Sequence, residues 1–138
     1  MGALDVYCLY EHGDTPVTVS TVDEADALIG LVRVESPSAA PVLLDVHLSG
    51  DPYAQGSDVG ITVDRGVIRY SGPEWPHGVV SAGNASTDGE PRSYFYMGHG
   101  REFPANSEVP IDVVRQAVKE FMESSGARPT CVRWQDAP

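Results

Sequence analysis

Apolar side chains recur every three or four residues in two segments of the chain, and this spacing predicts an amphipathic helix in each. The first helix is expected over Val22–Glu35, where Ser20 or Thr21 can cap its start. The second is expected to begin at Pro110 and to stop at Gly126. The side chains expected to face the core are Val22, Ala25, Leu28, Ile29 and Val32 in the first helix and Ile111, Val114, Ala117, Val118, Phe121 and Met122 in the second.

Shorter runs of apolar or alternating residues predict strands. The expected strands are Leu4–Tyr10, Pro41–Leu48, Val59–Val63, Val67–Tyr70, Gly78–Ala82, Ser93–Met97 and Cys131–Gln135. The loops expected between them are Ser49–Ser57, Gly72–His77 and Gly83–Pro91. Gly66 is expected to supply a positive φ in a hairpin turn. In the aromatic strand Ser93–Met97, we expect Phe95 and Met97 to face the core.

The expected order of elements is therefore β-α-β-β-β-β-β-α-β. Because short loops join most consecutive strands, the sheet should be mainly antiparallel, with about six to seven strands and both helices packed on one face. The chain has 138 residues, a length that suits one domain. The sequence thus predicts a single α+β domain over residues 1–138.

Charge is distributed unevenly along the chain, whose formal net charge is -11. Residues 1–64 hold 11 acidic residues and one basic residue, Arg33, whereas residues 65–138 hold 9 acidic and 8 basic residues. An acidic half repels nucleic acid and anionic membranes and attracts basic partners. The alternative is that the acidic residues serve solubility alone.

No run of about 18 apolar residues is present, so no membrane-spanning segment is expected. The first residues also lack a basic start followed by an apolar run, so we expect no secretory signal and a cytoplasmic protein. Cys8 and Cys131 are expected to be buried free thiols, with a disulfide between neighbouring strands as the alternative. No phosphate-binding loop, nucleophile elbow or CxxC motif appears.

Several segments in the second half resemble the immunity protein 1 family of bacterial polymorphic toxin systems. The matching segments are Gly66–Tyr70, Val80–Asn84, Tyr94–Gly98, Glu102–Pro104, Ile111–Met122, Arg128-Pro129 and Trp134. The resemblance covers roughly residues 59–135, and we expect the first half to be the divergent part. It implies a small cytoplasmic α+β protein that binds and neutralises a cognate toxin, usually a nucleic-acid deaminase. It implies no catalytic residue, cofactor or metal.

Three groups of residues are candidate contacts for such a partner. Trp75 lies in a Pro-flanked loop with Glu74 and His77, and Trp is frequent among binding hot spots. The alternative is that Trp75 folds back onto the edge of the core. Asp88 and Glu90 form a loop-tip pair that could dock basic residues. The third group is His99, Arg101 and Glu102, in a Gly-rich corner that we expect to be an exposed turn.

Two other functions remain open from the sequence. A small hydrolase or isomerase could use His99 as an acid or base poised by Glu102. A metal site there would need a third ligand, and no paired spacing links these residues to the other histidines. The other alternative is a regulatory domain that binds a ligand in an internal pocket.

Overall fold

The computed structural model describes residues 3–7, 17–35, 41–48, 51–62, 64–72, 74–83, 91–96, 99–124 and 126–136. Two helices, α1 (Val22–Glu35) and α2 (Ile111–Glu123), accompany a large sheet. The strands are β1 (Leu4–Tyr7), β2 (Val17–Val19), β3 (Val42–Leu48), β4 (Asp51–Ile61), β5 (Arg65–Gly72), β6 (Trp75–Ala82), β7 (Arg92–Tyr96), β8 (His99–Phe103), β9 (Val109–Pro110) and β10 (Arg133–Asp136), and a 3-10 turn spans Ala105–Ser107.

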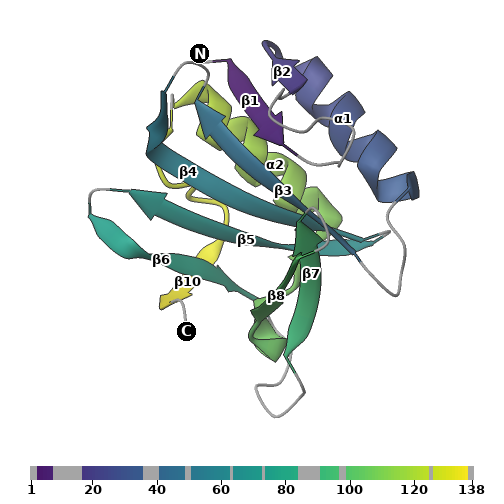
Figure 1. Cartoon of the computed structure of the whole chain (residues 1–138), viewed down its shortest axis with the longest axis vertical. Coiled ribbons are helices and arrows are strands. Elements are labelled where there is room, and N and C mark those ends of the chain that lie inside the picture. The colour runs from purple at the N-terminus through teal and green to yellow at the C-terminus, as the bar shows by residue number, and fades with distance from the viewer. Residues whose placement is uncertain are drawn as a thin grey trace.

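The ten strands of the described chain form one sheet with the order β10-β6-β5-β4-β3-β1-β2, and neighbours along this path are antiparallel (Figure 1). The β7–β8 hairpin joins β3 through a parallel pairing of Val42 with Phe95, and β9 pairs with β5. The α+β class and the mainly antiparallel sheet are confirmed. The predicted count of six to seven strands is too low, because β2, β8 and β9 were not predicted.

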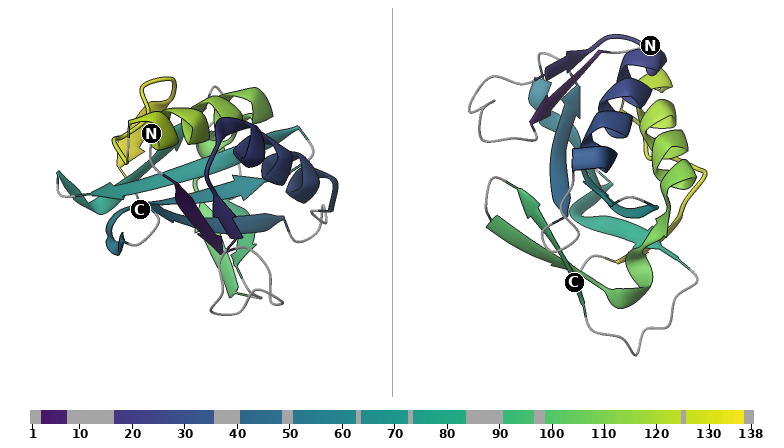
Figure 2. Two further views of the ribbon diagram at one scale, coloured as in Figure 1. Left: turned by 90° about the horizontal axis from the view of Figure 1, so that it is seen from above. Right: turned by 90° about the vertical axis from the view of Figure 1, so that its right-hand side faces the viewer.

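Both helices cover one face of the sheet, as predicted, and the β7–β8 hairpin stands on the opposite face (Figure 2). The main core lies between the helices and the sheet. A smaller cluster lies under the hairpin and consists of Leu43, Val67, Val80, Tyr94 and Phe103. The fold therefore leaves part of the sheet, beside this hairpin, free of helical cover.

Local sequence signals set both helices. At α1, Thr21 accepts a hydrogen bond from the backbone N–H of Glu24 (3.1 Å), and the Glu24 carboxylate accepts one from Ser20 N–H (3.3 Å). This arrangement is a variant of the capping box, in which the N–H that Glu24 accepts comes from Ser20 and not from the N-cap residue Thr21. The six apolar residues predicted to face the core from α2 are all buried. After α2, Gly126 adopts φ 102° and donates its N–H to the Phe121 carbonyl (2.8 Å), which confirms it as the stop.

Two predicted loops are partly strands. The loop expected at Ser49–Ser57 is wrong from residue 51 onward, because β4 begins at Asp51 and pairs with β3 across an irregularity after His47. The loop expected at Gly72–His77 is wrong because β5 extends to Gly72, which pairs with Trp75 at the start of β6. Glycine and proline favour loops locally, but pairing with neighbouring strands overrides that preference.

The turn before β5 differs from the prediction for Gly66. Gly66 lies inside β5 opposite Ile61 and does not have a positive φ. A side chain there would collide with the carbonyl oxygen of Gly60, so the position needs the small size of glycine. The turn itself is closed by Thr62, whose N–H donates to the Arg65 carbonyl (2.8 Å).

The inward face of β7 is the opposite of the one predicted. Tyr94 is buried and packs edge-on against Phe103 with ring centroids 5.7 Å apart, whereas Phe95 is half-buried. Met97 lies outside the described residues. The expected turn at His99 is also wrong, because His99 begins β8 and pairs with Tyr96. Pairing with β8 selects the face, and a shift of one residue inverts the side chains of a strand.

The last strand is shifted relative to the prediction and spans Arg133–Asp136. Cys131 therefore precedes it, and the residue is exposed and has a free thiol. The expectation of a buried thiol is wrong for Cys131, and Cys8 lies outside the described residues.

Candidate interaction surface

Charged side chains line up across three central strands on the sheet face that the helices leave open. Asp45 of β3 pairs with Asp58 of β4, and Asp58 pairs with Arg69 of β5. Directly opposed residues of antiparallel strands project to the same face. Arg101 of β8 joins them from the hairpin, and its Nη1 donates to Asp58 Oδ2 at 2.6 Å. We call Asp45, His47, Asp58, Arg69 and Arg101 the charged strip.

Asp58 is the central carboxyl group of the charged strip. Its side chain is only 17% exposed, and Arg69 Nη1 lies 4.0 Å from the same oxygen that binds Arg101. Burial, and then the charge of Asp45, raise the pKa of Asp58, while Arg101 and Arg69 act in the opposite direction. The two arginines therefore hold together two neighbouring carboxylates that would otherwise repel each other.

Two glycines make room for the strip. Gly78 has φ 81°, and a side chain there would lie 2.9 Å from the Arg69 guanidinium. A side chain at Gly56 would lie 3.3 Å from the His47 ring. Arg69 and His47 thus occupy space beside Gly78 and Gly56 that a larger residue there would fill.

His47 ends the strip at its β3 side. Its Nε2 lies 2.9 Å from Asp45 Oδ1, and its ring stands edge-on to Tyr7 with centroids 6.3 Å apart. Its Nδ1 is buried and has no hydrogen-bond partner within the described part of the chain. Sequence reasoning missed Asp45, His47, Asp58 and Arg69 as a group. The sequence signal for part of this group was the alternation along β3, in which Asp45 and His47 alternate with the apolar residues Leu44, Val46 and Leu48.

The first predicted contact group lies at the β5–β6 turn. Glu74 and His77 are exposed there, as a partner contact requires. Trp75 is half-buried and packs against the main core, with the Arg128 guanidinium 4.1 Å above its ring. The structure thus favours the alternative of a Trp folded onto the core edge. The His77 carbonyl accepts from Arg69 Nη2 (2.9 Å), which connects this turn to the charged strip.

The other predicted contacts are distributed over the hairpin and a loop. Arg101 and Glu102 lie on β8 and are exposed, but Arg101 is already engaged with Asp58. The His99 side chain lies outside the described part of the structure, as do Asp88 and Glu90. The structure therefore connects Arg101 with His77 through Asp58 and Arg69. It leaves a His99–Glu102 pair as a hypothesis.

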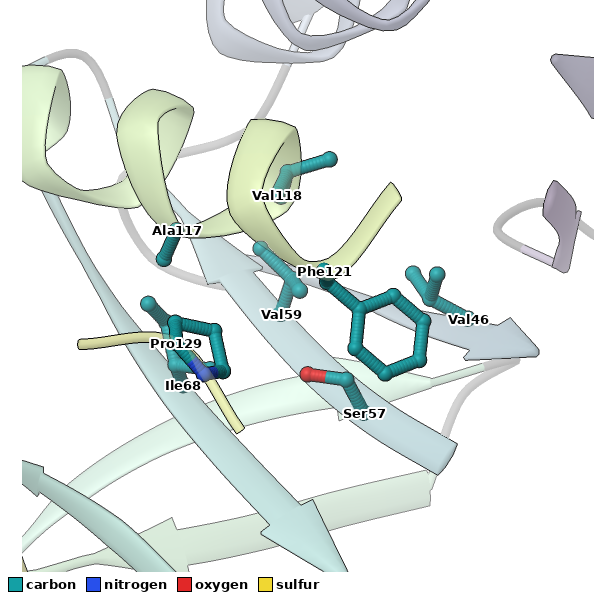
Figure 3. Close-up of a pocket in the computed structure, with 8 residues that line it drawn as sticks. All are labelled: Val46, Ser57, Val59, Ile68, Ala117, Val118, Phe121 and Pro129. Atoms are coloured by element: carbon teal, nitrogen blue, oxygen red, sulfur yellow. The ribbon is translucent and has the colours of Figure 1, made fainter. Parts of the chain in front are cut away.

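A small apolar pocket lies between α2 and the sheet (Figure 3). Its lining includes Val59, Ile68 and Phe121, with Pro129 at one side and Ser57 as its polar member. The enclosed volume of about 10 Å³ has room for about one water molecule. Ligand pockets are typically some hundreds of Å³, so this pocket does not favour the ligand-binding alternative.

Neither a membrane-spanning helix nor a metal-binding cluster is present among the described residues. None of the helices there is long and apolar enough to cross a membrane. In the same residues, no group of three or more His, Cys, Asp or Glu side chains is arranged to hold a metal ion.

Comparison with known families places these features in context. The family model described as immunity protein Imm1 matches residues 13–136, which is most of the chain. No curated protein sequence matches this chain. The match includes most of the acidic first half, where sequence reasoning expected divergence.

Proposed function

The chain belongs to the Imm1 family of immunity proteins, and we propose that it protects its host by binding a cognate nucleic-acid deaminase toxin and covering the active cleft. Family membership indicates an immunity protein that binds a toxin. The deaminase class, the covering of the cleft and action in the cytoplasm are our proposal.

The observation that carries the proposal is the acidity of the first half, with 11 acidic residues and one basic residue in residues 1–64. A toxin that acts on DNA or RNA presents Lys and Arg to phosphates. A deaminase also has a zinc pocket that receives the target base. An acidic inhibitor is steered toward such a basic cleft and, once bound, excludes the nucleic acid from it.

The sequence predicted eight contacts, and three of them are exposed residues whose own side chains form no hydrogen bond or ion pair within the described part of the chain. These are Glu74, His77 and Glu102. Glu74 and His77 lie around the β5–β6 turn, and Glu102 lies on β8. These two places flank the charged strip. We retain them as one candidate surface for the toxin, to be tested against others, and call them the sheet-end contacts.

The direct test measures protection against, and binding to, a candidate toxin domain of the nucleic-acid deaminase class. Cells that express the toxin should survive only when they also express this protein. The purified pair should form a complex with Kd near or below about 1 nM, as tight inhibitors require. Added salt should slow association, because screening shortens the reach of the acidic surface. Equal survival without this protein would refute the proposal.

The enzyme alternative is tested in the same assay. The double variant H99A/E102A should protect cells as well as the native protein does, because inhibition by binding needs no acid or base. A small-molecule turnover by the native protein that disappears in the double variant would favour the enzyme.

A further inference from the structure

Helix α1 carries an apolar stripe on the side that faces away from the core. Among the described residues, the large hydrophobic side chains that are exposed are Leu31 (55%) and Val34 (81%), and both lie on α1. Ala27, four residues before Leu31, is exposed as well. Residues spaced by four and three positions share one helix face. We call Ala27, Leu31 and Val34 the outer stripe.

The outer stripe is not needed to pack α1. The helix already buries a separate stripe of Ala25, Ile29 and Val32 against the core. A surface helix with one packed face ordinarily has polar residues on the other. Helix α2 follows that rule, since its exposed positions are Asp112, Gln116 and Glu123. The two helices thus differ, because the exposed large apolar side chains of the described residues both lie on α1.

The position and contacts of α1 make the outer stripe accessible and hold it in a fixed conformation. The helix lies at the outer edge of the helical layer, with α2 on its inner side (Figures 1 and 2). The capping box of Thr21 and Glu24 fixes its start. Asp26 Oδ1 lies 4.0 Å from Arg115 Nη1 of α2 and ties the two helices together. A partner would therefore meet a preformed surface, which lowers the entropic cost of binding.

The charges around the outer stripe select the kind of occupant. Asp23 and Glu24 are exposed in the first turn of α1, and the side chain of Asp26 is 47% exposed. A second copy of this chain would bring the same acidic residues and a charge of -11 against them. An anionic membrane would be repelled in the same way. The complementary occupant is a protein with an apolar patch bordered by Lys and Arg.

We propose that the outer stripe of α1 is the apolar centre of the surface on which the toxin docks, with Asp23, Glu24 and Asp26 at its acidic rim. This inference rests on the proposed function and specifies where the partner binds. Binding hot spots are apolar or aromatic anchors surrounded by a polar rim. Trp75 was the sequence-level candidate for such an anchor, but it is packed beneath Arg128. Leu31 and Val34 are free to serve instead.

The stripe alone is small compared with the roughly 800 Å² that each partner contributes to a standard interface. The acidic rim and neighbouring surface must supply the remaining area. The proposal therefore expects two separable effects. Loss of apolar contact should raise the dissociation rate, and loss of acidic rim residues should slow association.

The test compares the double variant L31Q/V34Q with the matched control Q116A on α2. Glutamine is a good helix former, so the variant should fold with an unchanged melting temperature. Its Kd for the same purified candidate toxin domain should rise at least about tenfold, a loss of about 1.4 kcal/mol. The control should bind as the native protein does. The single variant V34Q serves if the double variant is unstable.

Other outcomes would overturn the inference. An unchanged Kd for L31Q/V34Q, with a raised Kd for E74A/H77A/E102A, would move the toxin to the sheet-end contacts and leave the proposed function standing. A native dimer that becomes monomeric in L31Q/V34Q, with toxin affinity unchanged, would make the stripe a self-association surface. A native protein that fails to bind the toxin at all would refute the proposed function and this inference together.

Discussion

The guanidinium of Arg128 lies 4.1 Å above the centroid of the Trp75 ring, and Tyr70 meets the same ring edge-on at 6.0 Å. The same guanidinium also lies 5.9 Å from the centroid of the Trp134 ring. A Trp from the β5–β6 turn is thus held by a residue that follows α2. This contact bears on the role of Trp75, because a ring that packs against Arg128 and Tyr70 offers less surface to a partner.

Substituting Trp75 by Ala should therefore lower stability more than binding. We expect W75A to lose about 2 kcal/mol of unfolding free energy, less than a fully buried Trp because the ring is only half-buried. Urea unfolding checks this. R128Q should lose about 0.5–1 kcal/mol, the range of an accessible cation–π contact. A W75A variant with native stability and greatly weakened toxin binding would restore Trp75 as an interface anchor.

Removing Arg101 should destabilise the protein in a pH-dependent way. Arg101 lowers the pKa of Asp58, which burial and Asp45 already raise above the ordinary 3.8. Without Arg101 the pKa should rise further, and at neutral pH the buried carboxylate loses its closest counter-charge. We expect R101A to cost about 1 kcal/mol at pH 7.

The sign of the pH dependence follows from linkage. A carboxyl group whose folded-state pKa is raised binds its proton more tightly when folded, so the cost of its charge disappears as the pH falls through that pKa. The stability gap between R101A and the native protein should therefore close on acidification, and unfolding curves from pH 7 downward would show it. E102A, on the same strand, is the control and should show a constant gap. A gap for R101A that stays constant to pH 4 would contradict the proposed role of Asp58.

Two glycines should respond to alanine in opposite directions. Gly78 has a positive φ and lies under the Arg69 guanidinium, so G78A should cost about 1–2 kcal/mol. Gly30 lies inside α1, where an added methyl group meets only Arg115 Nη2, at 3.7 Å. G30A should stabilise the protein by up to about 1 kcal/mol, because alanine is the better helix former. Thermal unfolding of both variants checks the pair, and equal melting temperatures would show that neither site acts as described.

The thiol of Cys131 should react slowly although the residue is exposed. Partial burial raises the pKa of this thiol, and Glu120 raises it further through a hydrogen bond and through its negative charge. The pKa reaches about 12. In a Cys8→Ser background, alkylation by iodoacetamide should rise about tenfold per pH unit from pH 7 to 9 without levelling off, because only the thiolate reacts. E120Q should react faster at every pH. A rate that bends away from this slope between about pH 8 and 9 in the Cys8→Ser background would mean an unperturbed thiol.

Local signals in the sequence predicted the parts of the fold that depend on local chemistry. The bounds of α1 follow from its cap and its apolar spacing, and Gly126 ends α2 because few other residues adopt a positive φ. The resemblance to immunity proteins was visible in the second half and is confirmed over residues 13–136. The strands that failed prediction, β4 at its start and β8, contain Gly, Pro or charged residues whose local preference is for loops.

The candidate site was predicted only in fragments. Arg101 and His77 were chosen as separate contacts, and the structure connects them through Asp58 and Arg69, which had not been chosen. Those two residues are far from Arg101 in the chain, and strand register alone brings them together. Whether Trp75 is covered depends on Arg128, more than fifty residues later, so its surroundings could not follow from its own loop.

The sequence by itself determined the two helices, the α+β class, the acidic first half and the family, because periodicity, caps and composition are properties of neighbouring residues. Tertiary structure alone decided which face of β7 is buried, which carboxylates share counter-charges and which apolar side chains remain in solvent. Those outcomes depend on pairing and packing between distant segments. For Leu31 and Val34 the physical reason is simple: α1 has one neighbour layer, and the core takes only the face that touches it.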